Sequence, residues 1–117
     1  AFGLALAALQ SSATEKNECN LKNSTWNYLQ NLMWQVVNHK DGTGQVARIN
    51  NADIHGKTGT AQNPHGDDHS WFAGYMVKDG EAVLSLVVLV EHGGKGSVEA
   101  ASISHKVFKY AQKNLSL

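Results

Sequence analysis

The chain has 117 residues and carries 10 Lys plus Arg against 10 Asp plus Glu, so its formal net charge is zero with neutral histidine. This length allows one domain or part of one, with a modest core, and the single cysteine, Cys19, excludes an internal disulfide framework. A balanced charge provides no overall field for a polyanion, and we therefore expect no nucleic-acid partner.

The first nine residues are apolar. They fall far short of the roughly 18 to 20 residues that span a bilayer, and they lack the basic start of a signal peptide. We interpret them as the end of a core helix and the polar stretch that follows as a surface loop or linker. The predicted organisation is a truncated helix and polar linker over residues 1–23, followed by the main unit over residues 24–117. A chain that starts inside an element is expected to be a fragment.

An amphipathic helix is predicted from Ser24 onward, with Ser24 or Asn23 as its N-cap and Asp41-Gly42 as its end. Its apolar residues recur at the three- and four-residue spacing of one helix face: Leu29, Leu32, Met33, Val36 and Val37. We expect its aromatic residues to pack against the protein rather than to stack on a ligand: Trp26, Tyr28 and Trp34.

The strand signals predict an antiparallel meander around residues 53–91, preceded by a short strand over residues 45–50. The strands of the meander are expected at residues 54–62, 71–77 and 82–90, with a tight hairpin at residues 78–80. The last strand is apolar almost throughout, so two layers should cover it. Ser97 is expected to cap a final helix that runs to about Gln112. The predicted fold class is α+β, an antiparallel sheet flanked by helices.

The run Gly56–Gln62 places a cation, two hydroxyls and a glycine within a few residues, which suits an extended segment that receives an anion. A phosphate-binding loop is one alternative, but Asn51 stands where its first glycine belongs, and the residues after Lys57 make a poor helix start. A second glycine-rich turn, Gly93–Ser97, is open to two interpretations, an anion-holding loop or a plain strand-to-helix connection.

Metal binding is a further alternative, because His and carboxylate side chains gather in one predicted loop. Ligands of this kind suit zinc or another transition metal. The loop contains Pro64 and Gly66, which oppose a helix that would aim two histidines to one side. We interpret the group as solvated loop charges and predict neither a metal nor a cofactor; its members are His65, Asp67, Asp68 and His69, with His55 ten residues upstream.

The surroundings of the Lys-Thr-Gly run resemble the C-terminal part of the transpeptidase domain of class B penicillin-binding proteins. The resemblance covers about residues 29–117 and implies a partial beta-lactamase/transpeptidase-like fold in a bacterial enzyme of peptidoglycan synthesis. Such an enzyme acts at the outer face of the cytoplasmic membrane or in the periplasm. The elements that carry the resemblance are, in order, Gly42-Thr43-Gly44, Lys57–Gln62, Ser70–Tyr75, the apolar strand, and Gly93–Ser97 before the last helix.

The resemblance implies roles for four residues of the run. Lys57 supplies positive charge to a cleft, and the hydroxyls of Thr58 and Thr60 bind the carboxylate that ends a D-alanyl peptide or a penicillin. Gly59 lets the ligand backbone approach a strand edge. The backbone N–H of Thr60 is implied as one of two donors to the oxyanion that forms on the attacked carbonyl.

Two further motifs of the family are absent from this sequence: Ser-x-x-Lys, which carries the nucleophile, and Ser-x-Asn. Both precede Lys-Thr-Gly in the family, so we expect a parent D,D-transpeptidase and no acyl-enzyme on this chain alone. Expected partners are the peptidoglycan stem peptide and beta-lactams in the complete domain, the remainder of that domain, or a second copy on an exposed sheet face. The alternatives are a noncatalytic binding module, or a fragment of a serine beta-lactamase or D,D-carboxypeptidase.

Overall fold

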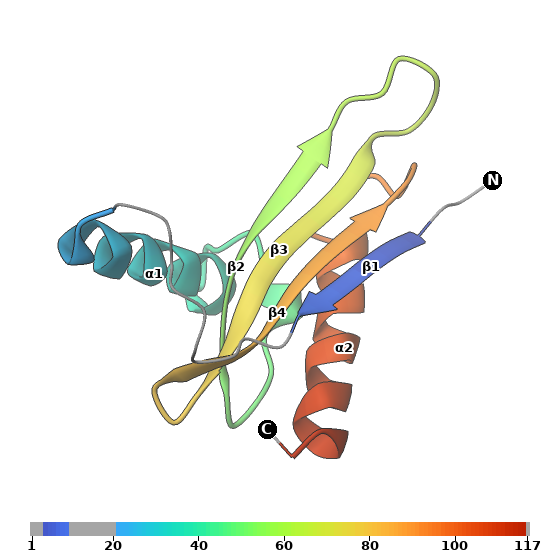
Figure 1. Ribbon diagram of the computed structural model, residues 1–117. Helices are drawn as coiled ribbons and strands as arrows, with labels where there is room; N and C mark the ends of the chain where they lie inside the picture. Colours follow the sequence, from blue (N-terminus) through green and yellow to red (C-terminus); the bar gives the residue numbers. More distant parts are fainter. Residues whose placement is uncertain (1–3, 10–20, 117) are drawn as a thin grey trace.

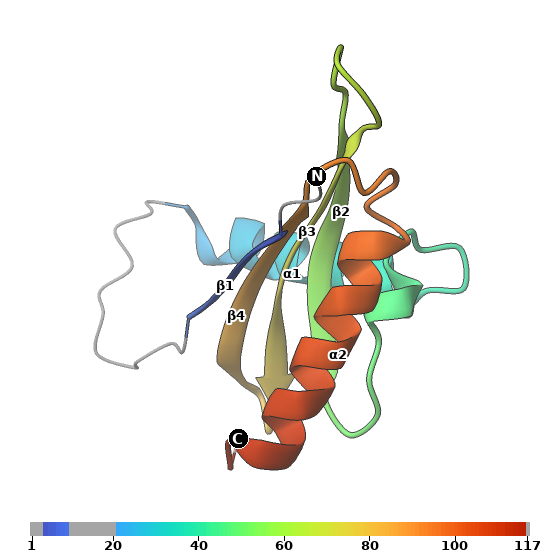
Figure 2. The same cartoon turned by 90° about the vertical axis from the view of Figure 1, so that its right-hand side faces the viewer.

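The computed structural model describes residues 4–9 and 21–116, which form a four-stranded antiparallel sheet and two long helices (Figure 1). The strand order is β1-β4-β3-β2, so β2 lies at one edge of the sheet. Figure 2 shows α2 lying along one face of the sheet, while α1 lies beside β2. The elements are β1 (Leu4–Leu9), α1 (Asn23–Asn38), the 3₁₀ helix η1 (Gln45–Ala47), β2 (Asp53–Ala61), β3 (His69–Lys78), β4 (Glu81–Val90) and α2 (Glu99–Asn114).

The predicted meander is confirmed. β2 pairs with β3 from Asp53↔Val77 to Ala61↔His69, and β3 pairs with β4. The hairpin between β3 and β4 forms where the sequence predicts it, because Asp79 and Gly80 both have positive φ, 52° and 81°, as a type I′ turn requires. The α+β class therefore holds, and its sheet has one strand more than the meander.

The additional strand corrects the interpretation of the N-terminal segment. Residues Leu4–Leu9 form β1 rather than the end of a helix, and they pair with β4 from Leu4↔Val90 to Leu9↔Ser85. Ala and Leu favour a helix intrinsically, but six residues make a marginal helix, whereas pairing here satisfies the backbone groups along the outer edge of β4. Most of the predicted linker over residues 10–23, including Cys19, lies outside the described residues.

The predicted strand over residues 45–50 is also wrong, because its start is the 3₁₀ helix η1. Its bonds run over three residues, from the N–H of Ala47 to the carbonyl of Gly44 (3.0 Å) and from the N–H of Arg48 to that of Gln45 (3.1 Å). Ala47 and Ile49 are buried, whereas Val46 is exposed. The apolar spacing that resembles a strand is produced by a short turn that packs against α2.

The helix boundaries differ from the predicted caps. α1 begins after Lys22 without any side-chain cap, so neither Asn23 nor Ser24 caps it. It ends at Asn38, before the predicted end at Asp41. α2 begins after Val98, again without a side-chain cap of its own, so Ser97 does not cap it. Both helices are held by packing and by contacts from other elements.

The core lies between the sheet and α2. Alternate residues of β4 are buried, namely Leu84, Leu86 and Val88, and the rings of Phe72 and Phe108 meet edge to face with centroids 6.4 Å apart. Within the described residues no second layer buries the opposite face of β4, where Val87 is 41% exposed. β4 is apolar on both faces, and of the two covering layers that the sequence predicts, the described residues supply one.

α1 follows the outer side of β2 instead of forming that second layer. The amide of Asn38 donates to the carbonyl of Ile54 (3.0 Å), and Trp34 Nε1 donates to Asp53 Oδ1 (3.4 Å). Of the predicted apolar stripe, Val37 alone is fully buried, and the expectation that Tyr28 packs is wrong, since it is 64% exposed. The helix therefore presents apolar surface beside the edge strand.

Candidate functional site

The Lys57–Thr60 run lies on the outermost strand of the sheet, where one row of backbone groups has no partner strand. In an antiparallel pair, every second residue directs both its N–H and its C=O away from the partner. The carbonyl of Ile54 points away from β3, since it accepts from Asn38. The regular register of β2 then places the N–H groups of Thr58 and Thr60 on the same open edge.

The side chains of the run are held in different ways. Lys57 is exposed, and its Nζ donates to the carbonyl of Thr58 (2.7 Å). Thr58 is nearly buried, and its Oγ1 lies 2.8 Å from Oγ1 of Thr43. Thr60 is exposed, and its Oγ1 accepts from the N–H of Gly96 (3.3 Å). A cation and two hydroxyls thus gather along one edge, each hydroxyl contacting a group from outside the strand.

Thr43 enters the site through the turn after α1. The N–H of Gly44 donates to the carbonyl of Val36 (2.8 Å), and a Cβ on Gly42 would lie 2.6 Å from the carbonyl oxygen of Gln35. The turn therefore requires glycine to approach the helix so closely. The sequence predicts a turn at these glycines, but it gives no signal that Thr43 reaches Thr58.

A groove of about 730 Å³ lies between α1 and the run. Leu29, Leu32 and Val36 of α1 line it, together with Thr43 and Lys57. Leu29 and Leu32 are 37% and 40% exposed. The candidate site is therefore an edge strand with a cation, flanked by an apolar groove.

The glycine-rich turn Gly93–Ser97 packs closely against the run. Gly96 is buried, and a Cβ there would overlap the carbonyl oxygen of Gly59 and lie 2.5 Å from that of Trp71. The N–H of Gly94 donates to the carbonyl of Asp68 (2.8 Å), and the N–H of Gly96 is used by Thr60. Of the two interpretations, a strand-to-helix connection fits better than an anion-holding loop, because these donors are already used.

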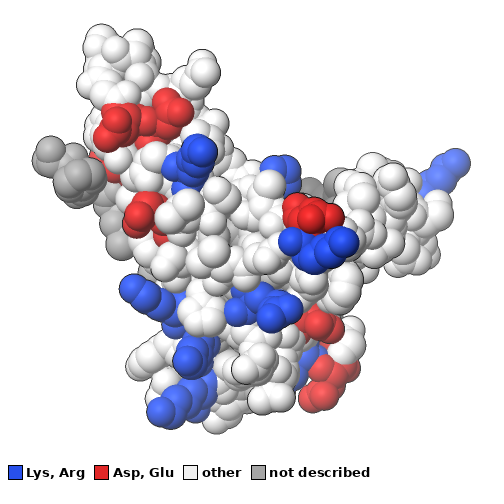
Figure 3. Space-filling model, turned by 180° about the vertical axis from the view of Figure 1, so that it is seen from behind, with Lys and Arg blue, Asp and Glu red and all other residues white. Residues whose placement is uncertain are grey.

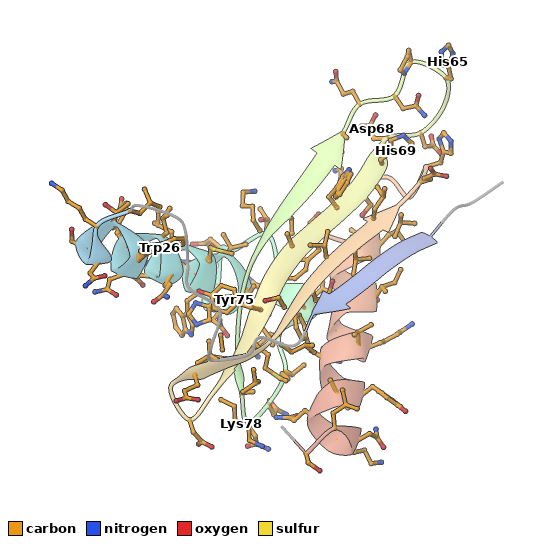
Figure 4. All side chains as sticks on the ribbon, in the orientation of Figure 1. Trp26, His65, Asp68, His69, Tyr75 and Lys78 are labelled. Atoms are coloured by element: carbon orange, nitrogen blue, oxygen red, sulfur yellow. The ribbon has the colours of Figure 1, made fainter. Side chains whose placement is uncertain are left out.

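The predicted histidine and carboxylate loop does not assemble as a group. His65 lies at the tip of the β2–β3 loop, while Asp68 and His69 lie at its base (Figure 4). Nδ1 of His69 accepts from the N–H of His92 (3.0 Å), and the two rings have centroids 5.0 Å apart. Among the described side chains no group of three or more His, Cys, Asp or Glu has the geometry to hold a metal ion. The sequence did not indicate that His92 joins this loop.

His55 lies far from that loop and stacks on Tyr75, with ring centroids 4.9 Å apart. Burial raises the pKa of Tyr75 above its ordinary value of 10.0. Its hydroxyl has no hydrogen-bond partner within the described part of the chain. This aromatic pair belongs to the packing between α1, β2 and β3.

Basic side chains gather over the C-terminal half of α2, on the side seen from behind (Figure 3). Lys106, Lys109 and Lys113 of α2 are exposed, and Lys113 lies in the last turn, where the helix dipole favours positive charge. No helix among the described residues is long and apolar enough to cross a bilayer.

Comparison with known proteins finds a match to the family described as penicillin binding protein transpeptidase domain, over residues 4–109. A curated relative, peptidoglycan D,D-transpeptidase MrdA of Haemophilus influenzae, is 34% identical over 76% of this chain and 16% of its own length.

Two solved structures are similar in fold and sequence. Pseudomonas aeruginosa PBP2 in complex with WCK 5153 has a TM-score of 0.64 and 33% identity, over 74% of this chain and 19% of that chain. Penicillin-binding protein A from M. tuberculosis, as an imipenem acyl-enzyme complex, has a TM-score of 0.60 and 27% identity, over 76% of this chain and 19% of that chain. The chain spans less than a fifth of the length of each of these relatives.

Proposed function

Because this chain belongs to the penicillin-binding protein transpeptidase family, and corresponds to part of a class B domain, we propose that it carries the substrate-binding strand of a peptidoglycan D,D-transpeptidase. The ligands are the C-terminal carboxylate of a D-alanyl stem peptide and the carboxylate of a beta-lactam. The imipenem acyl-enzyme of the M. tuberculosis relative supports the second ligand class.

The open edge of β2 at Thr58 and Thr60 is the observation that carries this proposal. An extended peptide binds such an edge by adding a strand, and the exposed backbone groups supply its hydrogen bonds. The edge stays open only beyond the part that α1 covers at Ile54. The open part of the edge is therefore short, and it fits a short extended ligand better than a long strand.

The four residues of the run then take the roles that the family resemblance implies. Lys57 provides positive charge beside the ligand carboxylate, and the hydroxyls of Thr58 and Thr60 bind it. The N–H of Thr60, on the open edge, is one donor to the oxyanion that forms when the ligand carbonyl is attacked. Gly59 keeps the strand surface free of a side chain.

The nucleophile and its base come from the rest of the parent enzyme, since this sequence contains no Ser-x-x-Lys. The remainder of the domain covers the groove beside Leu29 and Leu32, and the parent acts at the outer face of the cytoplasmic membrane. In the isolated chain the sheet face around Val87, which the described residues leave uncovered, associates with a second copy. Sedimentation should then detect concentration-dependent association that Val87→Lys weakens, and a strictly monomeric chain would contradict it.

A titration of the isotope-labelled chain with N-acetyl-D-alanyl-D-alanine, followed by NMR, tests the binding role. The amide signals of Thr58 and Thr60 should shift, and Lys57→Met should weaken binding about tenfold, as the loss of a charge-assisted contact would. Lys109→Met removes an equally exposed charge from α2 and should leave the affinity unchanged. The proposal fails if no amide of β2 responds.

Mass spectrometry with a fluorescent penicillin tests the proposal that the nucleophile comes from the rest of the parent enzyme. We expect no covalent adduct on this chain, because it lacks the nucleophile. A stoichiometric mass shift would contradict the division of the site between this chain and the rest of its parent.

A further inference from the structure

Ser70 is a buried hydroxyl that the proposed function leaves unused. It lies on β3 directly opposite Thr60 in the register of the sheet, and it has no exposed surface. Its Oγ donates to the carbonyl of Lys95 (3.1 Å) and accepts from the N–H of Ala100 (2.9 Å). Ser70 thereby supplies to α2, from another element, the N-terminal cap that α2 lacks.

These two bonds flank Gly96 in the chain. They hold the segment before α2 against the sheet, where Gly96 is buried over the backbone of Gly59. In this position the N–H of Gly96 reaches Oγ1 of Thr60 (3.3 Å). The anchor at Ser70 and the contact between Gly96 and Thr60 thus hold the same short segment against the sheet.

The direction of that contact is fixed by chemistry. A backbone N–H can only donate, so the oxygen of Thr60 accepts, and the hydroxyl hydrogen of Thr60 remains available to an acceptor outside the protein. A carboxylate has acceptors only. The loop thus prepares Thr60 as a donor at the open edge.

We propose that Ser70 is a positioning residue for the ligand site: by anchoring the segment around Gly96, it orients the Thr60 hydroxyl as a donor toward a carboxylate at the open edge of β2. The identity of the ligand rests on the proposed function. The orientation of Thr60 rests on the contacts within this chain.

Hydrogen exchange at the Gly96 and Ala100 amides, measured by NMR on the whole chain, tests the anchor. Ser70→Ala removes both bonds and should speed exchange at these amides about tenfold or more, because a buried donor and acceptor lose their partner. Ser104→Ala is a matched control: Ser104 is equally buried, but its Oγ bonds to the carbonyl of Ala100 within α2 (2.7 Å). It should leave the Gly96 amide unchanged.

Ser70→Cys keeps a similar side-chain size with a weaker donor and acceptor, and it provides the same measurement should Ser70→Ala not fold. It should give exchange rates between those of the wild type and Ser70→Ala. Unchanged exchange at Gly96 in both Ser70 variants overturns the proposal.

Titration with N-acetyl-D-alanyl-D-alanine tests the consequence for binding. Ser70→Ala and Thr60→Val should each weaken affinity about fivefold to tenfold, and the double variant should lose little more, since both act through one hydroxyl. Equal affinity of Ser70→Ala and the wild type would overturn the link to the ligand. If even the wild type does not bind, the proposed function fails, and exchange at Gly96 still decides whether Ser70 holds the segment.

Discussion

Replacement of Gly96 by alanine should destabilise the protein severely, because the new Cβ has no space. It would overlap the carbonyl oxygen of Gly59 and lie 2.5 Å from that of Trp71 and 2.8 Å from the backbone nitrogen of Gly59. All three obstacles are backbone atoms of paired strands, so the segment before α2 must move. Overpacking typically costs about 1–3 kcal/mol.

Moving the segment also breaks the bond to Thr60 and strains the two bonds at Ser70, each of which contributes about 0.5–1.5 kcal/mol. We therefore expect a loss of about 3 kcal/mol or more in the free energy of unfolding. For a chain of this size that lowers the melting temperature by roughly 12 °C or more. Thermal unfolding followed by circular dichroism at one protein concentration measures it.

Gly59→Ala is the matched control, because a Cβ at Gly59 would meet only the Cβ of Trp71, at 3.3 Å. A shift of a few tenths of an ångström between the two strands relieves this contact, and alanine is the better strand residue, so the two effects should leave stability within about 1 kcal/mol of the wild type. A Gly96→Ala protein that melts within about 4 °C of Gly59→Ala would refute the reasoning.

Three further changes test other parts of the fold. Asn38→Ala removes the bonds from its amide to the carbonyls of Trp34 (2.9 Å) and Ile54 (3.0 Å) and should cost about 1–2 kcal/mol in urea unfolding. Asn31→Ala, which removes a long exposed bond to Gln35, should cost less than about 0.5 kcal/mol, and equal losses would contradict the role of Asn38. Gly80→Ala places a side chain at φ 81° in the hairpin and should cost about 1 kcal/mol or more. Asp79→Asn, at φ 52°, should leave stability unchanged because asparagine suits a type I′ turn. Urea unfolding of both variants compares the two costs. Tyr75→Phe removes a buried hydroxyl that has no partner among the described residues, so stability at neutral pH should stay equal or rise. Burial raises the pKa of Tyr75 above 10.0, so the unfolded chain releases this proton at lower pH than the folded chain does. As pH rises above 10.0, the wild type should therefore lose more stability than Tyr75→Phe. Parallel pH profiles of stability for the two proteins would contradict this.

Local chemistry made the meander predictable. The turn at Asp79-Gly80 needs two residues with positive φ, and the segments on either side have the length of strands, with aromatic residues before the turn and valines after it. The Lys57–Thr60 run could be assigned to a strand for the same reason. Its place at the sheet edge could not, because edge position depends on which strands pair across the whole fold.

Tertiary pairing explains the errors. Residues 4–9 have a helical composition, and only the outer edge of β4 makes them a strand. Ser97 has the residue type of a cap, yet the cap of α2 comes from Ser70, 30 residues away in sequence. A hydroxyl that bonds across elements leaves no periodic pattern, so Ser70 and Thr43 could be identified only in three dimensions.

The edge of β2 combines protection with access. An unpaired strand edge invites association with other strands, and proteins reduce this hazard by covering the edge or by placing charge on it. Here α1 covers the start of β2 through Asn38, and Lys57 places a charge where the cover ends. What stays open is the part at Thr58 and Thr60, whose backbone donors face outward while their hydroxyls are held by Thr43 and Gly96. An edge exposed by accident would need no such contacts behind it, and this difference favours a ligand-binding edge over a merely unfinished sheet.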